Sequence, residues 1–135
     1  MSENEQAEKT PFDILGAEKV GRIARSFYEA MALDEPELAK LHECDESGRV
    51  VREMQERFAL FLAGWLGGPQ EYMQRHGHPR LRMRHRRVGI DKPMRDAWWR
   101  AMATALDEEA VPGPIREFLD ERFFKMANHL INKVD

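Results

Sequence analysis

The sequence predicts an all-α protein built as a single domain. Apolar residues recur at steps of three and four through most of the chain, which is the period of one buried helix face. No stretch alternates convincingly between apolar and polar residues, and no internal repeat appears. The length of 135 residues suits one domain with one core. Residues 1–9 are polar and are expected to form a disordered tail, which leaves 10–135 as the domain.

Two strong apolar faces predict helices in the first half of the chain. The first face follows Gly16 and consists of Val20, Ile23, Ala24, Phe27 and Met31. Asp34 and Pro36 are typical of the N-cap and first turn of a short helix, which is expected to end near Leu41. A polar loop over 44–49 precedes the second face, which consists of Val50, Met54, Phe58, Phe61, Leu62 and Trp65. The Gly-Gly-Pro sequence at 67–69 should end that helix.

Two further helices are predicted in the second half. Asp91 and Pro93 are typical of a helix start, and the apolar positions that follow are Met94, Ala97, Trp98, Ala101, Met102 and Ala105. Pro112 and Pro114 precede the last helix. Its expected buried residues are Ile115, Leu119, Phe123, Met126, Leu130 and Ile131.

Composition excludes several classes of protein. The longest uncharged run, 58–70, has 13 residues and contains Gly-Gly-Pro, so it is too short to span a bilayer, and no leader opens the chain. The single cysteine, Cys44, excludes an internal disulfide framework and favours a reducing compartment, so we expect a cytoplasmic protein. The net charge is −3, although residues 75–87 hold six arginines and no acid. An acidic body with one basic strip argues against broad nucleic-acid binding and favours binding of a small anion.

The strip 76–90, HGHPRLRMRHRRVGI, concentrates three histidines and five arginines. A zinc site is disfavoured because the chain has one thiol and no two of these histidines lie four apart on a helix. Binding of nucleic acid by this strip is disfavoured because no aromatic residue lies among the arginines. A haem remains possible, since the porphyrin supplies four nitrogens and the protein needs one axial ligand. Arginines would suit its two propionates.

Residues 61–102, FLAGWLGGPQEYMQRHGHPRLRMRHRRVGIDKPMRDAWWRAM, closely resemble the group II truncated haemoglobins. The resemblance extends from Phe12 to about Lys133, and its centre is GGP-x-x-Y, GHPRLRMRH and a tryptophan 13 residues after the last histidine of that motif. It implies a two-on-two helical sandwich around haem b with its iron. The chain departs from the family in having Gly16-Ala17 instead of Gly-Gly, and in a longer loop after His42.

The resemblance also assigns site residues. It implies that His85 is the proximal ligand of the haem iron, and that Tyr28, Trp98 and His42 are distal donors to the bound ligand. The implied haem-pocket residues are Phe27, Met54, Phe58, Phe61, Leu62 and Met94, and the implied propionate partners are Arg57 and Arg84. His76, His78 and His129 are interpreted as ordinary loop or surface residues.

The function implied by this resemblance is binding and transport of dioxygen, with nitric oxide and peroxide as other small ligands. The alternative within the haem interpretation is a peroxidase or nitric oxide dioxygenase, which would need a separate reductase because the chain has no flavin or nicotinamide domain. A rival of a different class is a haem-free helical interaction module that uses the arginine strip. We expect no nucleic-acid or membrane partner, and a monomer or weak homodimer.

Overall fold

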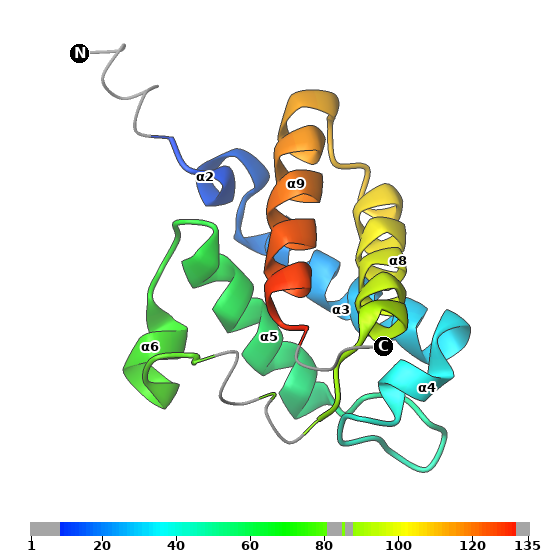
Figure 1. Ribbon diagram of the computed structural model, residues 1–135. Coiled ribbons are helices and arrows are strands. Elements are labelled where there is room, and N and C mark those ends of the chain that lie inside the picture. The colour runs from blue at the N-terminus through cyan, green and yellow to red at the C-terminus, as the bar shows by residue number, and fades with distance from the viewer. Residues whose placement is uncertain (1–8, 81–84, 86–87, 132–135) are drawn as a thin grey trace, which may run out of the picture.

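The computed structural model describes residues 9–80, 85 and 88–131, and most of these residues are helical. The helices are α2 (Pro11–Leu15), α3 (Ala17–Asp34), α4 (Pro36–Ala39), α5 (Arg52–Trp65), α6 (Glu71–His76), α8 (Lys92–Glu108) and α9 (Gly113–His129) (Figure 1). Within the described residues, β pairing is limited to one isolated bridge between Cys44 and Val50. The predicted all-α class is therefore confirmed. In the same part of the chain, no helix has the length and apolar character needed to cross a membrane.

Helix α3 is the centre of the fold, because both α8 and α5 pack against it. Helix α9 packs against α8, and the two run side by side in Figure 1. The least exposed side chains come from all four of these helices: Val20, Ile23, Phe27, Met31, Leu62, Met102, Leu106, Leu119 and Phe123. Removing apolar surface from water contributes about 25 cal/mol per Å², so this shared core is the main source of stability.

Helix ends follow from capping side chains where the sequence provides them. Thr10 and Asp13 form a capping box at the start of α2, in which each side chain accepts from the other residue's backbone N–H at 3.1 Å. Asp91 caps α8 by accepting from the Met94 N–H at 3.0 Å, which confirms the predicted start of that helix.

The predicted start and end of the short helix α4 are wrong. Asp34 is the last residue of α3, Glu35 is the N-cap of α4, and α4 ends at Ala39. The reason is Pro36, because the residue before a proline is disfavoured in the helical conformation. Glu35 accordingly has φ −131° and ψ 60°, and the chain breaks there.

Other predictions fail at the edges of the core. Val50 is buried but precedes α5, which begins at Arg52. Of the six residues predicted to be buried at the end of the chain, only Leu119 and Phe123 are. The others, Ile115, Met126, Leu130 and Ile131, are half-buried, and the last two follow the end of α9 at His129. Helices α2 and α6 were not predicted, because both are short and carry no repeated apolar face.

Two side-chain clusters attach α3 to α8. The Glu109 carboxylate just after α8 accepts from Arg22 Nε at 2.8 Å and from Ser26 Oγ at 3.1 Å. At the other end, the Arg100 guanidinium donates two hydrogen bonds of 2.8 Å to the Glu35 carboxylate. Paired bonds of this kind fix orientation as well as distance, so α3 and α8 are held in register at both ends.

The end of α5 lies close against α2. The Phe12 N–H donates to the Leu66 carbonyl at 3.0 Å, and a Cβ at Gly68 would lie 2.5 Å from the Phe12 ring. Gly67 has φ +94°, a conformation that side chains other than glycine rarely adopt. The Gly-Gly pair is therefore required both to turn the chain and to let α2 approach.

We predict that Gly68→Ala destabilises the protein, because the added methyl group displaces the Phe12 ring and with it α2. The expected loss is about 1–3 kcal/mol in the free energy of unfolding. Urea unfolding followed by helical circular dichroism measures it.

Gly21→Ala is the matched control for that substitution. Gly21 lies inside α3, and a methyl group added there would meet no neighbouring atom within 4 Å. The same substitution should therefore stabilise this helix by about 0.5–1 kcal/mol. Equal effects of the two substitutions would contradict the close approach of α2.

Candidate functional site

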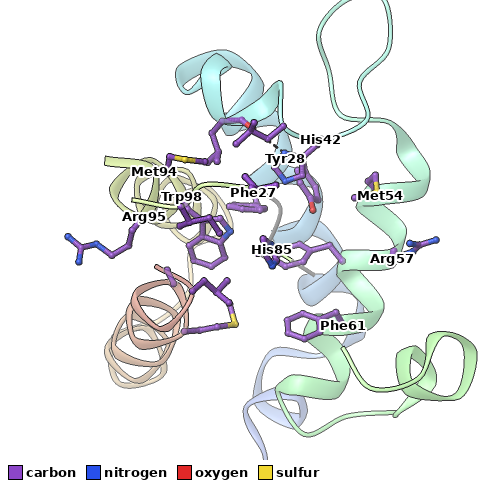
Figure 2. Close-up of a pocket in the computed structure, with 18 of the residues that line it drawn as sticks. Phe27, Tyr28, His42, Met54, Arg57, Phe61, His85, Met94, Arg95 and Trp98 are labelled. Carbon is purple, nitrogen blue, oxygen red and sulfur yellow. Dashed lines mark hydrogen bonds between the residues drawn. The ribbon is translucent and has the colours of Figure 1, made fainter. Parts of the chain in front are cut away.

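A cavity of about 530 Å³ lies among α3, α4, α5, α8 and α9, within the range of about 300–1,000 Å³ that is usual for ligand and cofactor sites (Figure 2). Its lining residues are Phe27, Tyr28, Leu38, Leu41, His42, Glu43, Met54, Arg57, Phe58, Phe61, Tyr72, His85, Val88, Ile90, Met94, Arg95, Trp98, Met126, Ala127 and Leu130. Most are apolar or aromatic, and a few polar groups are placed among them.

An aromatic cluster forms one wall of the cavity. The Phe27 ring lies 5.0 Å from the Tyr28 ring, 5.1 Å from the Phe58 ring and 5.1 Å from the Trp98 ring. Tilted and edge-on contacts at these distances are favourable for aromatic pairs. Since Phe27 is 1% exposed and touches residues of both α5 and α8, it fixes the positions of the rings that face the cavity.

Tyr28 brings a hydroxyl group to this wall. It is 5% exposed, and burial raises the pKa of its phenol above the usual range. The group is therefore a neutral donor at physiological pH. Among the residues that the structure describes, none makes a hydrogen bond to this hydroxyl. No buried side-chain nitrogen or oxygen among the described residues lacks a partner, so the Tyr28 oxygen is itself exposed to the cavity, and its proton is available to a molecule there.

His42 lies beside Tyr28, with the two rings edge to face and 5.6 Å apart. Its Nδ1 is 3.1 Å from the Leu38 carbonyl oxygen. Burial lowers the pKa of His42, hydrogen bonds to the Leu38 and Ala39 carbonyls oppose that shift, and the nearby His85 lowers it slightly further. His42 is therefore neutral at physiological pH.

Two adjacent tryptophans of α8 have different surroundings. Trp98 lines the cavity, where its ring contacts Phe27 and lies 6.0 Å from Phe123. Trp99 is turned about 100° around the helix and packs against Phe124, with the ring centres 6.3 Å apart. Only Trp98 of the two can donate its indole N–H into the cavity, and Figure 2 shows it at the cavity wall.

His85 reaches the cavity from the segment between α6 and α8. Figure 2 shows its imidazole pointing into the space enclosed by Tyr28, Phe61 and Trp98. Val88 and Ile90 from the same segment also line the cavity. Arg84 lies outside the described residues.

The structure brings nearly all of the remaining predicted residues to the cavity. Met54, Arg57, Phe58, Phe61 and Met94 all line it, and Arg57 is exposed at its edge with the guanidinium directed outward (Figure 2). Leu62 is the exception, because it is fully buried in the core and does not line the cavity.

Several lining residues were not predicted. Tyr72 packs its ring against Phe61 at 5.8 Å and against His76 at 5.1 Å. Its place in the GGP-x-x-Y motif was a usable signal. Leu38, Leu41, Met126 and Leu130 had no such signal, because a pattern of apolar residues does not distinguish a core from a cavity wall.

The residues present fit a haem. The cavity has large apolar and aromatic walls for the porphyrin faces and an imidazole, His85, for the iron. The Tyr28 hydroxyl, to which none of the described residues is hydrogen-bonded, faces the cavity and suits a small polar molecule there. Arg57, which is exposed at the edge of the cavity, is a cation of the kind that pairs with a propionate.

Comparison with known proteins agrees with this geometry. A family model described as bacterial-like globin matches residues 10–132. The chain is 34% identical over 130 residues to the group 2 truncated hemoglobin YjbI of Bacillus subtilis, and the match covers 96% of this chain and 94% of that protein.

Solved structures of truncated haemoglobins are similar along their whole length. A cold-adapted truncated hemoglobin from the Antarctic bacterium Pseudoalteromonas haloplanktis is 39% identical, with a TM-score of 0.85 over 93% of this chain and 100% of that one. The truncated oxygen-avid haemoglobin of Bacillus subtilis is 35% identical, with a TM-score of 0.83 over 92% of this chain and 100% of that one. The chain therefore belongs to the bacterial-like globin family, as a haem-binding group II truncated haemoglobin with the two-on-two helical fold.

Proposed function

We propose that this globin holds haem b through His85 and uses Tyr28 and Trp98 to bind dioxygen and other diatomic molecules. The observation that supports the proposal is that one apolar cavity is lined by three groups: the His85 imidazole, the Tyr28 hydroxyl and the Trp98 indole. The description of the Bacillus subtilis relative as oxygen-avid supports dioxygen as the ligand.

When bound, the haem would supply an iron that can bind a small molecule. The protein supplies the surroundings of that molecule. Tyr28 and Trp98 present O–H and N–H donors from an aromatic wall of low polarity, where hydrogen bonds are stronger than in water. Such fixed donors stabilise partial negative charge on a ligand and slow its release.

The haem propionates would be held by arginines at the cavity edge. Arg57 is placed there by α5, and Arg84 is the second candidate from the family motif. Arginine donates two parallel hydrogen bonds to a carboxylate, so each pair would orient the haem as well as bind it.

A second candidate function is consumption of nitric oxide or peroxide. Polar groups on the cavity wall, Tyr28, His42 and Trp98, favour it, because they can polarise a bond in a bound ligand. Either reaction needs electrons from a separate reductase. We propose a cytoplasmic location, since one cysteine suits a reducing compartment, and a monomer or weak homodimer.

The first prediction concerns His85. His85→Ala should lose tight haem binding, seen as a loss of the Soret absorbance of the purified protein. Because haem binds the folded state, the variant should also unfold at lower temperature. His129→Ala removes an exposed histidine at the end of α9 and should keep both properties. A His85→Ala protein with full haem content and an unchanged spectrum would contradict the ligand assignment.

The second prediction concerns the two tryptophans. A hydrogen bond to a charged partner contributes roughly 1.5–3 kcal/mol, and each ~1.4 kcal/mol is about tenfold. Trp98→Phe should therefore speed dioxygen dissociation roughly ten- to a hundredfold in stopped-flow measurements. Trp99→Phe is the matched control, since Trp99 packs against Phe124, and it should leave the rate within about twofold. Equal rates in the two variants would assign Trp98 to packing alone.

A further inference from the structure

The end of α4 determines which nitrogen of the His42 imidazole carries a hydrogen. Its Nδ1 lies 3.1 Å from the Leu38 carbonyl oxygen. A carbonyl oxygen only accepts hydrogen bonds, so Nδ1 must carry the hydrogen. A neutral imidazole has one N–H, and Nε2 is then a bare acceptor.

The surrounding contacts keep this arrangement in place. The last carbonyls of a helix lack partners within the helix, and α4 offers those of Leu38 and Ala39 to the residues that follow. The Ala39 carbonyl accepts from the His42 backbone N–H at 3.0 Å and from Cys44 Sγ at 3.2 Å. His42 is thus bound through both its backbone and its side chain. Because burial lowers the pKa of His42, the imidazole stays neutral.

The polar groups of Tyr28, Trp98 and His42 on the cavity wall are therefore of two kinds. Tyr28 and Trp98 offer protons, whereas the remaining nitrogen of His42 offers a lone pair. A bare nitrogen repels the partly negative oxygen of a diatomic ligand, and it attracts a ligand that carries a proton of its own.

We propose that His42 is a hydrogen-bond acceptor that makes the distal cavity selective for protic ligands, a class that includes hydrogen peroxide and undissociated hydrogen cyanide. This proposal rests on the proposed function, since it concerns ligands beside a haem held by His85. It replaces the third donor expected from the sequence. It also favours peroxide over nitric oxide as the substrate of any redox activity, because peroxide has O–H groups and nitric oxide has none.

The test compares a protic and an aprotic probe in the haem-loaded protein. At neutral pH hydrogen cyanide must give up its proton to bind ferric haem, and the proposal assigns the receipt of that proton to His42 Nε2. His42→Phe should slow cyanide association about ten- to a hundredfold, the range between one strong hydrogen bond and a positioned base. Carbon monoxide has no proton, so its association with the ferrous protein should stay within about threefold.

A second variant distinguishes loss of the acceptor nitrogen from a purely structural effect of the substitution. Glutamine keeps an acceptor oxygen, so His42→Gln should recover part of the cyanide rate that His42→Phe loses. Equal cyanide rates in wild type and His42→Phe would overturn the proposal, and so would an equal loss for cyanide and carbon monoxide.

The tautomer can be observed directly. In the carbon monoxide-saturated ferrous protein, which is diamagnetic, ¹⁵N chemical shifts distinguish a bare ring nitrogen from a protonated one. We expect the His42 Nε2 signal at the bare position, and a protonated Nε2 would overturn the proposal. Failure of the proposed function has a different signature, namely a purified protein without a Soret band.

Discussion

The contacts of the Phe27 ring determine the form of the site. This ring touches Tyr28 on its own helix, Phe58 on α5 and Trp98 on α8, at ring-centre distances of 5.0–5.1 Å. Because interiors are densely packed, moving one helix would force this ring to give up contacts with the others. The same ring therefore sets the separation of α3, α5 and α8 and the directions of the aromatic side chains on the cavity wall. Packing therefore positions the Tyr28 and Trp98 side chains on the cavity wall.

The apolar faces of the helices pack partly in the core and partly along the cavity wall. In α9, Leu119 and Phe123 are buried, whereas Met126 is half-buried on the cavity wall. In α5, Leu62 is in the core and Met54 faces the cavity. A repeat of three and four residues indicates a surface withdrawn from water and does not say what covers it. That is why the existence of these helices could be predicted from the sequence and the burial of their last residues could not.

The predictable features are those with a local cause. Asp91 is a capping residue at the right position before an apolar face, and its helix begins there. Asp34 has the same side chain, but Pro36 moves the break to Glu35, so two local preferences competed and the steric one prevailed. The role of His42 depends on the position of the Leu38 carbonyl, which the sequence does not indicate. Only the motif indicated a haem and proposed His85 as its ligand, since one histidine among five has no spacing to mark it.

The loop over 43–51 lies between two residues of the cavity wall, and its own contacts hold it together. Asp45 closes it internally, with one carboxylate oxygen accepting from the Ser47 N–H, the Ser47 hydroxyl and the Arg49 N–H at 2.7–3.1 Å.

The two ends of the loop are joined as well. Cys44 and Val50 form a β bridge, and the Val50 carbonyl accepts from Gln55 Nε2 at 3.1 Å. A turn that satisfies its own polar groups and brings its ends together transmits little displacement to the flanking chain. His42 before it and Met54 after it both lie on the cavity wall. The hydrogen bond that fixes Nδ1 of His42 comes from the Leu38 carbonyl of α4 and involves no residue of this loop.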